Sequence, residues 1–118
     1  MEEYLLLMRL DLLTKEEQPS PEQLQEYMKQ YHDWVGGIAA QNKFNGGTGL
    51  STEGKVIKTN NVITDGPFAE IKESIAGFIS IKANDFDEAV ALASACPILQ
   101  GAGNSVEVRK VVSVHNKN

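Results

Sequence analysis

The chain has 118 residues, a formal net charge of −5 and an acidic isoelectric point. We expect residues 1–118 to form one domain, large enough to bury a core. The basic residues are scattered, which argues against binding to nucleic-acid phosphates. No apolar run approaches the roughly 20 residues that span a bilayer, and the acidic start is unlike a secretory signal. A single cysteine cannot form an internal disulfide, so we expect a cytoplasmic protein.

The first strand and the first helix have clear sequence signals. Residues 4–10 are mostly apolar whichever way they point, which predicts a central strand covered on both faces. Ser20, Pro21 and Gln23 then form the start of a helix, with a cap, a first-turn proline and a capping box. We expect this helix to reach Gln41, although two glycines weaken it. Its predicted buried stripe is Leu24, Tyr27, Met28, Tyr31, Val35 and Ile38.

The rest of the chain alternates strands, turns and one more helix. We predict strands at 44–50 and 55–58, and a hairpin arm at 62–63. A strand with Ile75, Gly77, Ile79 and Ile81 at period two, and with apolar residues on the other face, is again typical of a central strand. Asn84 or Asp85 caps the second helix, and Pro97 stops it. The predicted buried stripe of this helix is Phe86, Ala89, Val90, Ala93 and Cys96. Apolar and polar residues alternate from Val106 onward, and Val112 and Val114 follow, which predicts a last strand.

This order predicts an α+β fold, the ferredoxin-like split βαβ pattern with an antiparallel sheet. Two helices cover only one face of a four-stranded sheet. Because two strands are apolar on both faces, the other face also needs a cover. We expect that cover to be a second copy of the chain, in a two-fold homodimer.

The stretch from Thr64 to Ile81 joins a polar segment to the most apolar strand of the sequence. Asp65, Gly66 and Pro67 predict a tight turn, because Asp bonds nearby backbone, Gly tolerates positive φ and Pro fixes φ. Ionisable side chains follow directly. A polar cluster at the end of a rigid buried strand is a common construction for a functional site.

The string DGPFAEIKE, with the apolar strand, the Ala-rich helix and the closing GNSVEVRKV, resembles the DGPF branch of the YCII-related family. The likeness runs from the opening YLLLM to SVEVRKV. It implies a dimeric α+β barrel, and most members of the family have no assigned reaction. The resemblance also implies a histidine in the first helix, at His32, and small residues facing a cleft near Gly47.

His32 and Asp65 are the predicted catalytic pair. A histidine titrating near neutral pH can take and return a proton, and a carboxylate can orient it or act as the base. The alternatives are a structural histidine bonded to backbone and an aspartate that only completes its turn. Both readings stay open for each residue.

Glu70, Lys72, Phe68 and Gly47 are the predicted substrate-binding residues. Glu70 could bind a cationic or hydroxyl group, and Lys72 could bind a carboxylate. Solvated or structural roles are the alternatives for both. Phe68 either anchors the turn or lines a pocket. The glycines from 46 to 49 lack the phosphate-loop layout, which favours a turn or bulged strand there.

Nothing in the sequence indicates a metal or another cofactor, because it holds two histidines and one cysteine. Cys96 is expected to be a buried structural thiol. The resulting hypothesis is a cofactor-independent enzyme that transfers protons on a small carbonyl or lactone-type molecule. The substrate guess comes from the fold likeness of the wider group to muconolactone-type isomerases and dehydrochlorinases. The alternative is a non-catalytic module that binds a metabolite or a transcription-linked partner.

Overall fold

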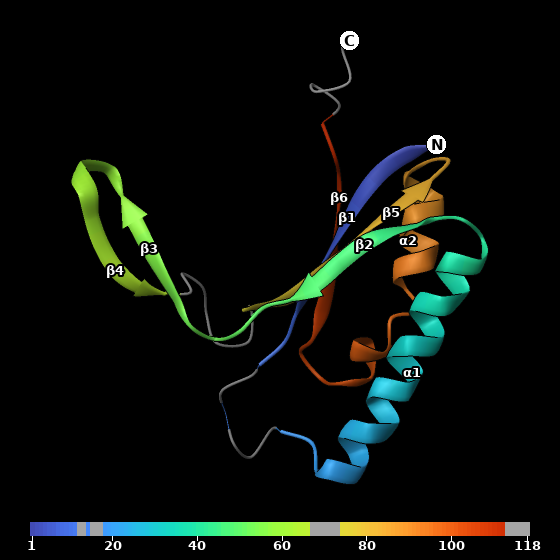
Figure 1. Ribbon diagram of the computed structural model, residues 1–118, viewed down its shortest axis with the longest axis horizontal. Helices are drawn as coiled ribbons and strands as arrows, with labels where there is room; N and C mark the ends of the chain where they lie inside the picture. The colour runs from blue at the N-terminus through green and yellow to red at the C-terminus, as the bar shows by residue number, and fades with distance from the viewer. Residues whose placement is uncertain (12–13, 15–17, 67–73, 113–118) are drawn as a thin grey trace.

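The computed structural model describes residues 1–11, 14, 18–66 and 74–112. It contains a four-stranded antiparallel sheet in the order β2-β5-β1-β6, with two α-helices, and a separate two-stranded hairpin (Figure 1). The strands of the main sheet are β1 (Glu2–Arg9), β2 (Phe44–Gly49), β5 (Ile75–Ala83) and β6 (Ser105–Lys110). This order confirms the predicted α+β, ferredoxin-like arrangement and the central positions of β1 and β5.

Helix α1 (Pro21–Ala40) begins as predicted. The Ser20 side chain accepts a hydrogen bond from the backbone N–H of Gln23, and the Gln23 side chain accepts one from the Ser20 N–H. The helix continues through both glycines and ends one residue before Gln41, which is its C-cap. Helix α2 (Phe86–Ala93) is capped by Asp85, whose carboxylate accepts a hydrogen bond from the Glu88 N–H.

The core lies between the helices and one face of the sheet. Cross-strand neighbours Leu6 and Ile79 lie at its centre, and Ile38 of α1 reaches it from the helix layer. The indole N–H of Trp34 donates to the Leu92 carbonyl at 2.9 Å, which ties α1 to α2. Cys96 is buried in this core as predicted, and burial raises the pKa of its thiol.

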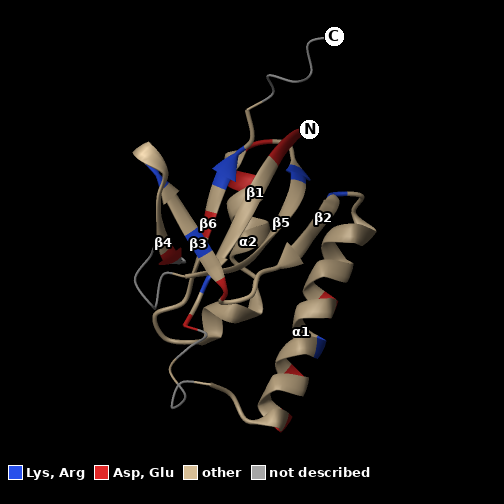
Figure 2. Cartoon of the chain, turned by 60° about the vertical axis from the view of Figure 1, so that its left-hand side comes forward, with Lys and Arg blue, Asp and Glu red and all other residues tan. Residues whose placement is uncertain are grey.

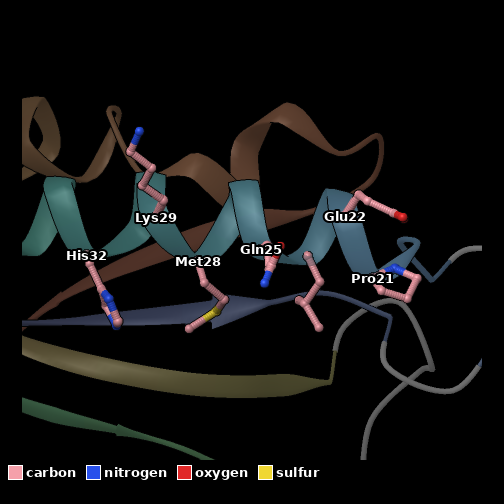
Figure 3. Close-up of a pocket in the computed structure, with 7 residues that line it drawn as sticks. Pro21, Glu22, Gln25, Met28, Lys29 and His32 are labelled. Atoms are coloured by element: carbon pink, nitrogen blue, oxygen red, sulfur yellow. The ribbon is translucent and has the colours of Figure 1, made fainter.

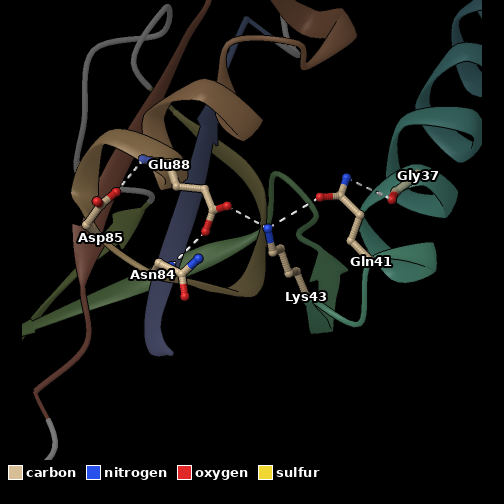
Figure 4. Close-up of polar contacts among 6 residues, drawn as sticks. All are labelled: Gly37, Gln41, Lys43, Asn84, Asp85 and Glu88. Carbon is tan, nitrogen blue, oxygen red and sulfur yellow. Dashed lines mark hydrogen bonds and ion pairs between the residues drawn. The ribbon is translucent and has the colours of Figure 1, made fainter.

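A polar cluster joins the end of α1 to the starts of β2 and α2 (Figure 4). The Lys43 ammonium contacts the Glu88 carboxylate at 2.6 Å, and the Asn84 N–H donates to the same carboxylate at 2.7 Å. These hydrogen bonds, that from Lys43 above all, lower the pKa of Glu88. The cluster fixes the C-terminal half of α1 on the sheet.

The predicted buried stripes are only partly buried. Leu24 and Met28 of α1 are exposed, as are Phe86 and Val90 of α2, so these four predictions are wrong. Leu24 and Met28 lie on the N-terminal half of α1, beyond the part tied down by Ile38 and Trp34. Phe86 still packs its ring against Tyr4 at 5.3 Å between centroids.

The hairpin consists of β3 (Gly54–Lys58) and β4 (Val62–Gly66), joined by the short 3-10 turn Thr59–Asn61. Among the described residues it pairs with no strand of the main sheet, and we call it the arm. In both views it projects from the sheet on the side away from α1 (Figures 1 and 2). The predicted turn does not begin at Asp65 and Gly66, because both residues are paired in β4, and its third residue, Pro67, lies outside the described residues.

Candidate functional site

The structure does not bring His32 and Asp65 together within one chain. His32 lies on α1, whereas Asp65 lies on the arm at the opposite side of the sheet (Figure 1). Both side chains are exposed. The Asp65 carboxylate contacts the ammonium of Lys55, its cross-strand neighbour, at 2.6 Å. The predicted pair is therefore not formed within one chain, and no contact of the Asp65 carboxylate with backbone is found among the described residues.

His32 lines a shallow hollow along the flank of α1 (Figure 3). We call it the α1 groove. Met28 and Gln25 point to the same side of the helix as His32 in the close-up. The residues that line the groove are Pro21, Glu22, Leu24, Gln25, Met28, Lys29 and His32. All of them belong to α1, so the groove has a floor and no opposite wall in the described chain.

The packing of β2 against β5 requires a glycine at position 47. A Cβ atom there would lie 2.5 Å from the Phe78 carbonyl oxygen and 2.7 Å from the Ile79 Cα. The backbone of β2 therefore approaches β5 too closely for any side chain. Gly47 lines neither the α1 groove nor the cleft described next. Phe68, Glu70 and Lys72 lie outside the described residues.

A larger cleft of about 820 Å³ opens between the N-terminal half of α1, the end of β1 and residues 97–104. Buried Pro97 and Ile98 of the short 3-10 helix η4 (Pro97–Gln100) contribute apolar lining. Its other lining residues are Leu10, Asp11, Gln18, Pro19, Gln23, Leu24, Glu26, Tyr27, Gln30, Ala76, Gln100, Gly101, Ala102 and Asn104. Leu24 lines both this cleft and the α1 groove.

Asp11 is the buried carboxylate of the cleft. It lies two residues beyond the end of β1, and its side chain accepts a hydrogen bond from the Thr14 N–H at 3.0 Å. The Gln18 amide donates to the Asp11 carbonyl, also at 3.0 Å. Asp11 was not among the predicted site residues. Its position just after a predicted central strand was the sequence signal that could have identified Asp11 as a site residue.

Two side-chain contacts shape the mouth and the wall of the cleft. The Gln100 amide donates to the Gln30 side-chain oxygen at 2.7 Å, which joins η4 to α1. Asn104 donates to the Ile98 carbonyl at 2.9 Å and holds the following loop in place. Tyr27 is half-buried, and that burial raises the pKa of its phenol to about 12. Tyr27 is therefore a neutral hydrogen-bonding group at ordinary pH.

The cleft offers amides, a phenol and carboxylates. No lysine or arginine is among its lining residues in the described ranges. Such a lining can hold an uncharged polar molecule over an apolar floor, which is the usual composition of a small-molecule site. No three potential metal-binding side chains cluster in the described part of the chain. No helix in that same part combines the length and the apolar character that crossing a membrane requires.

The model of the YCII-related domain matches residues 8–114. Among solved structures, 5-chloro-2-hydroxyhydroquinone dehydrochlorinase from Burkholderia phenoliruptrix AC1100, in complex with 2,5-dihydroxybenzoquinone, is similar at 19% identity. The alignment covers 96% of this chain and 98% of that chain, with a TM-score of 0.42. None of the curated proteins compared with the chain matches it. Because the domain model matches most of its length, the chain belongs to the YCII-related family.

Proposed function

We propose that the protein is a homodimer that binds a small, uncharged organic molecule in the cleft beside α1. The observation that carries the binding function is the lining of that cleft, where buried Ile98 and half-buried Tyr27 lie beside several side-chain amides. The absence of a cation among its described lining residues, with a net charge of −5, disfavours an anionic ligand.

The open face of the sheet supports the homodimer. Leu5, Leu7 and Phe78 point away from the helices and are half-buried, with no described element packed over them. Around them lie charges of both signs, including the Arg9–Glu107 ion pair at 2.9 Å. A second copy related by a two-fold axis would place the same apolar residues over this face, surrounded by the same charges of both signs.

The binding function can be tested by thermal unfolding with a panel of neutral lactones and hydroxy ketones. A bound compound raises the midpoint temperature because it binds only the folded state. Ala102→Trp should fill the cleft and abolish that rise, since Ala102 is an exposed lining residue. Ala95→Trp is the matched control, because Ala95 is also exposed but lies outside the cleft.

A rise that survives Ala102→Trp would place binding elsewhere on the molecule. Matching carboxylic acids should give no rise, and a stronger effect from them would contradict the uncharged ligand. The homodimer is tested by sedimentation equilibrium, where Leu7→Glu should give monomer. A wild-type monomer would refute that part of the proposal.

Acid–base catalysis by His32 and Asp65 is the second candidate function. It is favoured by the exposure of both side chains, which leaves each available to a partner subunit. In this mechanism Asp65 would orient the imidazole, and His32 would move a proton on a carbonyl or lactone-type substrate. His32→Ala should then abolish turnover of a carbonyl or lactone-type compound, while binding in the separate cleft, which His32 does not line, should be unchanged.

A further inference from the structure

The arm exposes apolar side chains that nothing in the described chain covers. Ile57 and Ile63 are directly opposite each other in the hairpin, and they are 70% and 61% exposed. The Lys55–Asp65 pair lies on the same face, because side chains two residues apart on a strand share a side. An isolated two-stranded hairpin is marginally stable in water, so the arm needs a surface to pack on.

The α1 groove is a second uncovered apolar surface. Leu24 and Met28 are 47% and 40% exposed, although their spacing is that of a buried helix face. Figure 3 shows Met28 and His32 directed to the same side of α1. The groove therefore has the shape and composition of a docking site for an elongated apolar element.

We propose that, in the homodimer, the arm of each subunit docks in the α1 groove of the other. The inference rests on the homodimer of the proposed function. The arm and α1 lie on opposite sides of one chain, so the arm cannot fill its own groove (Figures 1 and 2). Two chains related by a two-fold axis can instead exchange arms, which fills both grooves at once.

The surfaces that would meet are each balanced in charge: the groove holds Glu22 and Lys29, and the arm face holds the Lys55–Asp65 ion pair. The arm, Gly54–Gly66, carries two lysines against one aspartate. Helix α1 carries three acids, Glu22, Glu26 and Asp33, against Lys29 alone. Figure 2 shows blue positions on β3 and red positions along α1. Two α1 helices packed on each other would bring like negative charges together, whereas the balanced face of the arm avoids that repulsion.

The spacing of the residues brings Asp65 to His32 across the interface. Met28 and His32 are four residues apart, which is about 6 Å along a helix. Ile63 and Asp65 are two residues apart on one face, which is about 7 Å along a strand. With Ile63 on Met28, the Asp65 carboxylate of one subunit lies beside the His32 imidazole of the other. The docked arm would thus complete the predicted pair in trans.

Disulfide trapping between separately purified subunits tests the contact. Met28→Cys and tagged Ile63→Cys proteins are mixed, allowed to exchange and oxidised mildly. We expect a covalent species of one tagged and one untagged chain. The replaced side chains are exposed, so both variants should fold. Asp33→Cys replaces Met28→Cys in the control, because Asp33 is exposed on α1 outside the groove. The native Cys96 is buried. Each single variant, oxidised alone, measures the cross-linking that does not come from the Met28–Ile63 contact.

A second pair tests the orientation of the arm. His32→Cys mixed with Asp65→Cys should cross-link, whereas Leu24→Cys with Asp65→Cys should remain at the background level. Sedimentation of the same samples separates the two proposals. A dimer whose Met28–Ile63 cross-linking does not exceed the Asp33 control overturns the docked arm and leaves the homodimer intact. A monomer overturns both.

Discussion

The two faces of the main sheet differ in what covers them, although the same strands build both. On the face under the helices, Leu6 and Ile81 have no exposed surface. On the other face, their chain neighbours Leu5, Leu7 and Ser80 share the surface with charged residues. The apolar content of these strands therefore predicts a cover on both faces, and the described chain supplies the cover of one face.

The open face also organises its polar groups. The Ser80 hydroxyl donates to the Glu3 carboxylate at 2.6 Å, and the Asn45 amide donates to both residues at 3.2 Å. At the other end, the hydrogen bond from Arg9 is the main cause that lowers the pKa of Glu107. A surface with paired polar groups around an apolar centre is typical of a protein interface.

The largest expected effect is on the covered face. Leu6→Ala should lower the free energy of unfolding by about 2–5 kcal/mol, because it leaves a cavity in a closed core. Urea denaturation, at a protein concentration where sedimentation shows the monomer, gives the value. Leu7→Ala on the same strand is the matched control and should cost clearly less, since Leu7 is partly hydrated in the monomer. Equal losses would mean that the two faces are equally covered within one chain.

The edge of the sheet gives the next effect. Gly47→Ala should lower the free energy of unfolding by about 1–3 kcal/mol, because its Cβ would overlap the β5 backbone. Gly49→Ala is the control on the same strand, where the nearest atom would be 3.8 Å away, an ordinary contact. Urea denaturation of both variants measures the difference. A harmless Gly47→Ala would mean that β2 can move away from β5.

The fold could be predicted because its signals are local and agree with one another. The Ser20–Gln23 capping box, the Asp85 cap and the apolar runs of β1 and β5 each specify one element. The elements in that order permit few arrangements. The burial of Leu24 and Met28 was mispredicted because periodicity defines a face of a helix, not the length over which a sheet covers it.

The candidate site was harder to predict, because it depends on distances between remote segments. The cleft joins the end of β1 to residues 97–104, and no spacing rule links Asp11 to Gln100. Asp65 was expected in a turn because Asp-Gly-Pro is a strong turn sequence. In the structure Asp65 instead lies in β4, opposite Lys55 of β3. The pairing of Asp65 with His32 remains a prediction about two subunits.

A smaller effect is expected at the start of α1, the helix that covers the core and carries the groove. Ser20→Ala removes one member of the capping box and should cost about 1 kcal/mol. Hydrogen exchange at the first turn should show faster opening, while the amides around Ile38 stay protected. Faster exchange at Ile38 as well would show that the two halves of α1 open as one unit.

The smallest effect concerns pH and the half-buried wall of the cleft. The folded-state pKa of Tyr27 is raised to about 12, mainly by burial, from an ordinary value near 10. Between these values the unfolded chain loses the proton first, so the stability from neutral Tyr27 falls as pH rises from 10 to 12. Tyr27→Phe should therefore show a shallower fall in urea stability over this range than the wild type. Burial also raises the pKa of Tyr31 and Cys96 nearby, so the variant should retain part of the slope. If the fall in stability with pH is the same in Tyr27→Phe and the wild type, Tyr27 is as hydrated in the folded protein as in the unfolded chain. The part of α1 that lines the cleft would then not be covered by the rest of the chain.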